Sequence, residues 1–317
     1  MLHSNPSTSA RAHPGLTEVR HKLSEAERPI EQAILAAISL HFATFGGSRR
    51  ETYDAMPPRT PIAEGVTLEA VDRDGVRGWW VRPADAPADR AILFVHGGAY
   101  MLGSAEAYRG LVSQIAVRTG IAAFALDYPL APEHPFPAAY DATIAAKHWL
   151  KTLGVTQVAL MGDSAGGALA LAALSEVEGN SPKVAAVAVF SPWTDLALSG
   201  GSFTSPDTYD PIFQPQLLAG AAATYLGSAD PRDGRASPLY AVPDDLPPLL
   251  IQVGADELLL DDSRRYAASA AEKGGVVQLE IYEGLHHVFQ RSAGELLSAN
   301  AALDSVAEFL WKYWTTE

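Results

Sequence analysis

Short apolar runs alternate with amphipathic stretches along most of this chain. Several runs are continuously apolar, which indicates strands buried on both faces, as in a parallel sheet covered by helices. Between them, apolar residues recur every three to four positions, and the alternation predicts an α/β fold. The predicted strands are residues 66–71, 76–82, 91–95, 121–126, 158–161, 184–190, 249–253 and 276–282, and the predicted helices are residues 107–118, 138–153, a helix from residue 165, residues 261–273 and a last helix ending near residue 314.

The first two predicted strands are joined by Asp-Arg-Asp-Gly at residues 72–75. Asp-Gly between two strand-like runs is typical of a tight hairpin turn, so we expect this pair to be antiparallel.

Two segments interrupt the alternation. Residues 1 to about 22 are polar and contain Pro6 and Pro14, so we expect a mobile arm, and residues 30–45 then predict a helix lying over the domain. From residue 195 to 248 the chain is rich in Gly, Ser, Pro and Asp, with a single helical stretch at 214–226. Because this segment leaves the sheet after a strand, we expect it to cover the edge where α/β sheets bind ligands.

One core with two added pieces therefore accounts for the chain, since α/β folds often hold about 250 to 300 residues in one domain. The expected parts are an N-terminal arm and cap helix at 1–50, a first part of the core at 51–194, a cap insertion at 195–248 and a second part of the core at 249–317.

Composition narrows the function. Twenty-three basic and 37 acidic residues give a net charge of −14, which disfavours nucleic acid as a partner. No apolar run approaches the ~20 residues that span a bilayer, and the N-terminus lacks the apolar region of a secretory signal. We expect a cytoplasmic protein with no membrane partner, acting on a small apolar substrate. The oligomeric state is open, with a homodimer as one expectation.

A candidate nucleophile lies where the predicted strand 158–161 meets a small-residue helix. Residues 162–166 spell G-D-S-A-G, in which Ser164 takes a strained strand-to-helix turn and the flanking glycines avoid a steric clash. The turn lifts Ser164 Oγ out of the sheet, and the N–H of Ala165 faces any oxyanion formed there.

A serine nucleophile needs a histidine base and an acid that orients it. In α/β-hydrolases both follow the serine in the chain, and the histidines that follow Ser164 are His286 and His287. For the acid, the strand 249–253 is followed by two adjacent carboxylates, Asp256 and Glu257, and Asp195 is a third, weaker candidate.

Further oxyanion donors are predicted in the loop after strand 91–95, which begins His-Gly-Gly. Gly97 and Gly98 lack side chains, so their amides can approach a substrate oxygen closely. His96 precedes the serine and is expected to hold this loop rather than act as the base. No metal is expected, because adjacent histidines do not readily chelate one ion and the chain has no H-E-x-x-H motif and no cysteine.

Five sequence segments together resemble the hormone-sensitive-lipase-like (bacterial family IV) carboxylesterases of the α/β-hydrolase superfamily. They are HGGAY at 96–100, DYPLAPEHPFPA at 127–138, GDSAGG at 162–167, SPWTDL at 191–196 and the histidine loop GLHHVF at 284–289. The resemblance implies an eight-stranded, mostly parallel sheet flanked by helices, a helical cap, no cofactor, and hydrolysis of short acyl esters through an acyl-serine.

The resemblance also implies which histidine and which acid belong to the triad. The family's histidine stands three residues beyond a glycine, which from Gly284 is His287 rather than His286. The family's Asp-Pro-Leu-x-Asp pattern fits the register of Glu257, with Leu259 and Asp261 following it, better than that of Asp256.

The sequence therefore predicts a serine carboxylesterase, with lactones as intramolecular esters of the same chemistry. The predicted triad is Ser164, Glu257 and His287, and the predicted oxyanion hole is Gly97, Gly98 and Ala165. The alternative is a catalytically weak, small-molecule-binding receptor on the same fold, which would be expected to have a broken triad.

Overall fold

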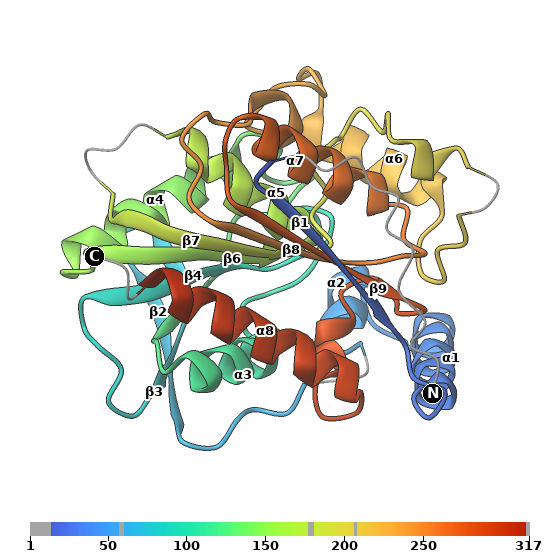
Figure 1. The fold of residues 1–317 in the computed structure, drawn as a ribbon, viewed down its shortest axis with the longest axis horizontal. Helices are drawn as coiled ribbons and strands as arrows, with labels where there is room; N and C mark the ends of the chain where they lie inside the picture. Colours follow the sequence, from blue (N-terminus) through green and yellow to red (C-terminus); the bar gives the residue numbers. More distant parts are fainter. Residues whose placement is uncertain (1–13, 57–59, 177–180, 206–207, 315–317) are drawn as a thin grey trace.

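A computed structural model describes residues 14–56, 60–176, 181–205 and 208–314 as one central sheet with helices on both faces (Figure 1). The strands are β1 (Leu16–Lys22), β2 (Val66–Arg73), β3 (Val76–Pro83), β4 (Arg90–Val95), β5 (Ala123–Leu126), β6 (Gln157–Asp163), β7 (Lys183–Phe190), β8 (Leu249–Gly254) and β9 (Val277–Glu283). The α-helices are α1 (Arg28–Thr44), α2 (Arg49–Asp54), α3 (Arg109–Thr119), α4 (Ala138–Thr152), α5 (Ser164–Ala172), α6 (Pro215–Leu226), α7 (Leu260–Glu272) and α8 (Leu297–Trp314).

The sheet has the strand order β1-β9-β8-β7-β6-β4-β5-β3-β2. All neighbours from β1 to β5 are parallel, whereas β3 pairs antiparallel with β5 and with β2. The predicted mostly parallel sheet and the antiparallel hairpin are confirmed. Asp74 and Gly75 both have a positive φ, of 57° and 76°, as a two-residue hairpin turn of the primed type requires.

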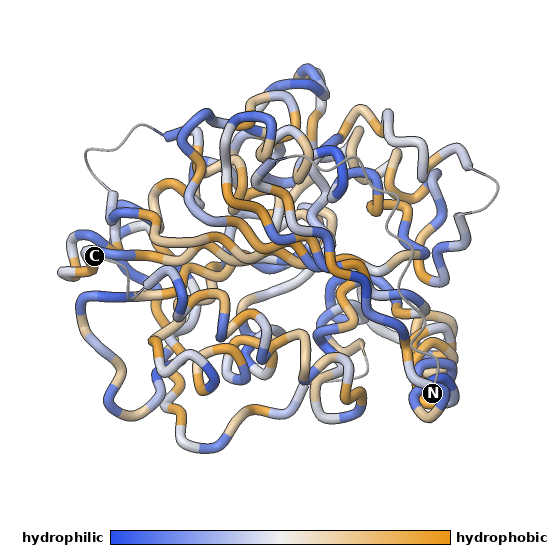
Figure 2. Tube along the Cα trace, in the orientation of Figure 1, coloured by the Kyte–Doolittle hydropathy of each residue, from blue (hydrophilic) through white to orange (hydrophobic). Residues whose placement is uncertain are grey.

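The sheet has nine described strands rather than the expected eight, because β1 pairs in parallel with the whole length of β9. The prediction of a mobile arm was therefore wrong for residues 16–22, and residues 1–13 lie outside the described part. β1 is mostly hydrophilic (Figure 2), and most of its side chains are exposed or half-buried. An edge strand of this kind gains its stability from backbone pairing, so it leaves little hydrophobic pattern in the sequence.

The middle strands are buried on both faces, as their continuous apolar runs predicted. β4, β5, β6 and β8 are buried along almost their whole length, and their side chains divide between two apolar clusters. In Figure 1, α3 and α8 cover one face of the sheet, while α4, α5 and α7 cover the other. None of the described helices is both long and apolar enough to cross a membrane.

Strand order fixes where a ligand binds. After β4 the chain forms β5 on one side of β4, and then crosses to form β6 on the other side. In open α/β sheets the crevice for ligands lies outside the carboxyl ends of the strands at such a reversal. His96 directly follows β4 and Ser164 directly follows β6, and these two strands are paired neighbours, so the two predicted motifs meet at this point.

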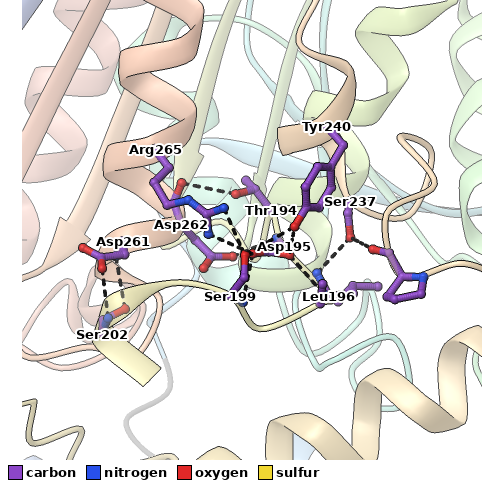
Figure 3. A network of polar contacts seen from close by, with 12 residues as sticks. Thr194, Asp195, Leu196, Ser199, Ser202, Ser237, Tyr240, Asp261, Asp262 and Arg265 are labelled. Atoms are coloured by element: carbon purple, nitrogen blue, oxygen red, sulfur yellow. Dashed lines mark hydrogen bonds and ion pairs between the residues drawn. The ribbon is translucent and has the colours of Figure 1, made fainter. Parts of the chain in front are cut away.

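The insertion that follows β7 is tied to α7 through Asp195 (Figure 3). The buried Asp195 carboxylate accepts hydrogen bonds from Arg265 Nη1 at 2.8 Å and from Tyr240 Oη at 2.9 Å. Its own backbone N–H donates to Asp262 Oδ2 at 2.9 Å. Since Asp195 follows β7 and Tyr240 precedes β8, this network ties both ends of the segment between these strands to α7.

Asp262 is the least satisfied carboxyl of this network. It is fully buried, and its Oδ1 atom has no hydrogen-bond partner among the described residues. Burial raises the pKa of Asp262 well above its ordinary value, although the Asp195 N–H and the Arg265 guanidinium act in the opposite direction. The folded protein therefore retains a proton that the unfolded chain has already released.

The Asp262→Asn variant is expected to gain stability relative to the wild type as the pH rises. The raised pKa of the folded state makes the free energy of unfolding of the wild type fall between about pH 4, where an unfolded aspartate titrates, and the folded-state pKa. The variant lacks this loss. Melting temperatures of both proteins, measured between about pH 5 and pH 8, should show a difference that grows in favour of the variant. A difference that stays constant over this range would contradict the raised pKa.

Candidate active site

The turn between β6 and α5 has the geometry of a nucleophile elbow. Ser164 has a φ of 51°, in the left-handed region that non-glycine residues rarely adopt. The serine is the first residue of α5 and is almost fully buried. Strain of this kind persists where the surrounding structure enforces it, and it projects the side chain away from both strand and helix.

The flanking glycines are required by contact with β4. A Cβ added to Gly166 would lie 2.1 Å from the carbonyl oxygen of Val95, and one added to Gly162 would lie 2.5 Å from the same atom. Real Cβ atoms do not approach a carbonyl oxygen so closely, so a larger residue at either position would push the elbow off the sheet. The steric reason given for the G-x-S-x-G pattern therefore holds in the structure.

Glu257 and His287 meet in a buried hydrogen bond. Glu257 lies in the turn after β8, His287 lies in the loop after β9, and the Nδ1 of His287 is 2.6 Å from Glu257 Oε2. The Glu257 side chain is fully buried, and the histidine ring nearly so. With Nδ1–H donating to the carboxylate, Nε2 is left as the basic nitrogen.

Burial and the neighbouring carboxylates act in opposite directions on the protonation of His287. Burial, the largest single effect, lowers the pKa of His287, whereas the Glu257 carboxylate, its hydrogen bond and the carboxyls of Asp210 and Asp163 together raise it by more. The net effect raises the pKa of His287. A carboxylate that stabilises the imidazolium in this way also stabilises the protonated histidine formed during general base catalysis.

The other residues considered for the triad histidine and acid lie in different surroundings. His286 bonds to Glu31 of α1, which accepts from the histidine backbone N–H at 3.1 Å and lies 2.7 Å from its Nδ1. Asp256 is exposed to solvent. Asp195 is enclosed by Arg265, Tyr240 and other groups of the network in Figure 3. The structure thus brings together the predicted pair, Glu257 and His287.

The oxyanion loop differs from the expectation at Gly97. The N–H of Gly97 donates to Asp163 Oδ1 at 2.9 Å, so this amide points into the protein and is not free for a substrate oxygen. Tyr108 Oη donates to the other oxygen of Asp163, also at 2.9 Å. His96 has the holding role expected of it: its Nδ1 lies 2.8 Å from the carbonyl oxygen of Gly97, and its ring stacks on Tyr128.

Three other backbone N–H groups near Ser164 and Gly97 are without a hydrogen-bond acceptor among the described residues. No hydrogen bond within the described ranges involves the backbone N–H of Gly98, Ala99 or Ala165. Gly98 has a φ of 117°, and its carbonyl oxygen accepts from Met101 and Leu102, which closes the loop into a tight turn. Ala99 also has a positive φ, of 52°. The N–H groups of Gly98 and Ala165 are thus unoccupied, and the N–H of Ala99 is a third unoccupied donor beside Gly98.

No group of three or more His, Asp or Glu side chains is arranged to hold a metal ion in the part of the chain that the structure describes. The polar groups of the site are therefore a hydroxyl, an acid–histidine pair and backbone amides. Such a set can carry out acyl transfer by a serine nucleophile.

The proteins that this chain is similar to include esterases of the α/β-hydrolase fold. A family profile described as the alpha/beta hydrolase fold matches residues 92–291. An acetyl-hydrolase of Streptomyces hygroscopicus is 39% identical over 234 residues, which cover 73% of this chain and 78% of the relative. An esterase of Acinetobacter venetianus is 35% identical over 257 residues, which cover 80% and 83%. The crystal structure of an esterase from the bacterial hormone-sensitive lipase family has a TM-score of 0.82 and 37% identity, and the match covers 90% of this chain and 98% of that one.

The chain belongs to the hormone-sensitive-lipase-like branch of the α/β-hydrolase fold family.

Sequence reasoning missed several residues around the site of this α/β-hydrolase. Phe213, from the insertion, packs edge-on against the His287 ring with 4.9 Å between ring centroids. Asp210, three residues earlier, accepts a hydrogen bond from the N–H of Leu258 at 3.0 Å, next to Glu257. The segment is aperiodic, so nothing in its pattern marks these two residues.

Glu257→Gln is expected to lower kcat by about 10⁴-fold, the scale known for neutralising a triad acid, because the amide no longer stabilises the imidazolium. Asp256→Asn, its matched neighbour, should change kcat far less, since Asp256 faces solvent. Steady-state hydrolysis of p-nitrophenyl acetate by both variants measures the difference. A near-normal Glu257→Gln alongside a crippled Asp256→Asn would overturn the assignment of the acid.

Proposed function

We propose that this protein is a serine carboxylesterase that hydrolyses short-chain acyl esters, lactones included, through an acyl-Ser164 intermediate. The observation that carries the proposal is the buried Glu257–His287 hydrogen bond, which lies at the same edge of the sheet as the strained Ser164. The acetyl-hydrolase and esterase names of the relatives support it. A receptor that only binds ligands has no use for this pair, so the alternative reading is not favoured.

The first half of the reaction forms the acyl-enzyme. Ser164 Oγ attacks the acyl carbon while Nε2 of His287 takes its proton, and the Glu257 carboxylate stabilises the resulting imidazolium. The negatively charged oxygen of the tetrahedral intermediate accepts hydrogen bonds from the N–H groups of Gly98, Ala99 and Ala165. Each of these hydrogen bonds lowers the activation barrier by about 3 kcal/mol.

Collapse of the tetrahedral intermediate expels the alcohol, which takes the proton from His287. Water then enters, His287 removes its proton, and the hydroxide attacks the acyl carbon. Collapse of this second intermediate breaks the bond to Ser164 Oγ, which takes the proton from His287, and releases the acid. Every atom and charge is accounted for by the ester, water and these side chains, so the steps require no cofactor.

The insertion at 195–248 and the N-terminal helix α1 act as the cap in this proposal. Phe213 of the insertion lies against the His287 ring, and Glu31 of α1 bonds to the adjacent His286, so both pieces touch the histidine loop. An apolar ring beside the base favours a small apolar substrate. The domain boundaries, a cytoplasmic location and a homodimer stay predictions of the sequence.

A panel of p-nitrophenyl esters of graded acyl length tests the proposal. Acyl chains of roughly two to eight carbons should be turned over best, since the family resemblance implies a cap that closes the pocket to a size suited to small ligands. Ser164→Ala should abolish turnover of all of them, and an organophosphate should label Ser164 stoichiometrically. Equal turnover of long-chain triglyceride emulsions would contradict the substrate class, and full activity in Ser164→Ala would contradict the mechanism.

A further inference from the structure

The turn that follows β7 contacts the segments that carry all three triad residues. Ser191 Oγ donates to Glu257 Oε1 at 2.7 Å and accepts from the N–H of Val288, the neighbour of His287, at 3.4 Å. Two residues later, the N–H of Trp193 donates to the carbonyl oxygen of Ser164 at 3.0 Å. Residues 191–193 therefore connect the elbow, the acid turn and the histidine loop.

The hydrogen bonds at Glu257 divide between its two oxygens. Oε1 accepts from the Ser191 hydroxyl and from the N–H of Gly254, at 2.7 and 2.6 Å. Oε2 faces Nδ1 of His287. An ionised carboxylate only accepts hydrogen bonds and Ser191 has a single hydroxyl proton, so the direction of this bond is fixed.

The position of Glu257 in the turn does not by itself hold its side chain in one conformation. Its side chain has three torsions between the backbone and the carboxylate, and each must be held for Oε2 to stay directed at the histidine. The two donors on Oε1 hold the far side of the carboxylate. One of them, Gly254, is backbone that β8 fixes, and the other is the Ser191 side chain.

Ser191 occupies a conformation that suits it poorly. Its φ is 45°, in the left-handed region, and it is fully buried and followed by Pro192. Glycine would adopt this backbone without strain but would lack the hydroxyl. Backbone strain at a buried polar residue beside a reactive centre is typical of a residue held there for function.

We propose that Ser191 is a positioning residue for the triad: its hydroxyl locks the Glu257 carboxylate so that Oε2 remains directed at His287. This inference rests on the proposed esterase function. Ser191 acts through Glu257, so its loss lowers kcat and leaves KM nearly unchanged.

Three single variants separate the hydroxyl from the backbone. Ser191→Ala and Ser191→Gly both lose the donor, and both should lower kcat on p-nitrophenyl acetate by about 10- to 100-fold, the range seen when a hydrogen-bond partner that orients a metal-ligating side chain is removed. Ser191→Cys keeps a weak donor and should give an intermediate kcat. Ser113→Ala is the matched control, because Ser113 is also fully buried and hydrogen-bonded but lies in α3, and its kcat should stay at the wild-type level.

The decisive experiment is a double-mutant cycle with Glu257→Asp. The shorter side chain withdraws the carboxylate by about one C–C bond, ~1.5 Å, which takes it beyond hydrogen-bonding distance of Ser191 Oγ. Ser191→Ala should then cost less than about threefold in the Glu257→Asp background, a clear departure from additivity. Melting temperatures of all variants identify any that fail to fold, and Ser191→Gly, which relieves the strained φ, serves if Ser191→Ala does not fold.

Each outcome has one meaning. Wild-type kcat in Ser191→Ala, or additive losses in the cycle, would overturn the role of Ser191. A loss in Ser191→Ala together with normal kcat in Ser191→Gly would assign the effect to the backbone and also overturn it. Failure of the esterase function itself is distinguishable, because the wild type would then show no turnover above Ser164→Ala on any ester.

Discussion

A carboxylate taken out of water is stable only where hydrogen bonds replace its hydration, and the arrangement of this active site follows from that requirement at Glu257. Its partners come from three adjacent places in the sheet: Ser191 after β7, Gly254 at the end of β8 and His287 after β9. Parallel pairing of β7, β8 and β9 puts these carboxyl ends at one edge, so the sheet topology itself supplies the donors. The same edge carries Ser164, one strand further along.

Much of the fold could be predicted because buried parallel strands and amphipathic helices leave strong hydrophobic patterns. One strand and one α-helix of the described part do not show these patterns. β1 is an edge strand whose stability comes from backbone pairing with β9, so its side chains carry little signal. The short helix α2 has no apolar period, and its signal in the sequence is the capping box formed by Ser48 and Glu51.

The site was predictable where the chemistry dictates residue type and spacing, and less so where it depends on the direction in which a backbone amide points. The glycines flanking Ser164 follow from the geometry of the turn, whereas the choice of Glu257 over Asp256 came from the family resemblance, and the structure places Glu257 against His287. A sequence does not tell which way an amide points, so Gly97 was expected to face the substrate although Asp163 takes its N–H. Ser191 and Glu31 act across long sequence separations, where only the folded chain brings partners together.

The central claim is that Ser164, the Glu257–His287 pair and the amides after β4 and β6 form one site. A crystal structure of the protein inhibited by a small alkyl phosphonate tests this most directly, since the adduct mimics the tetrahedral intermediate. The account predicts phosphorus bonded to Ser164 Oγ, the phosphoryl oxygen within about 3.1 Å of the Gly98, Ala99 and Ala165 nitrogens, and Gly97 still bonded to Asp163. An adduct on another residue, or a phosphoryl oxygen held by Gly97 or by none of these amides, would contradict it.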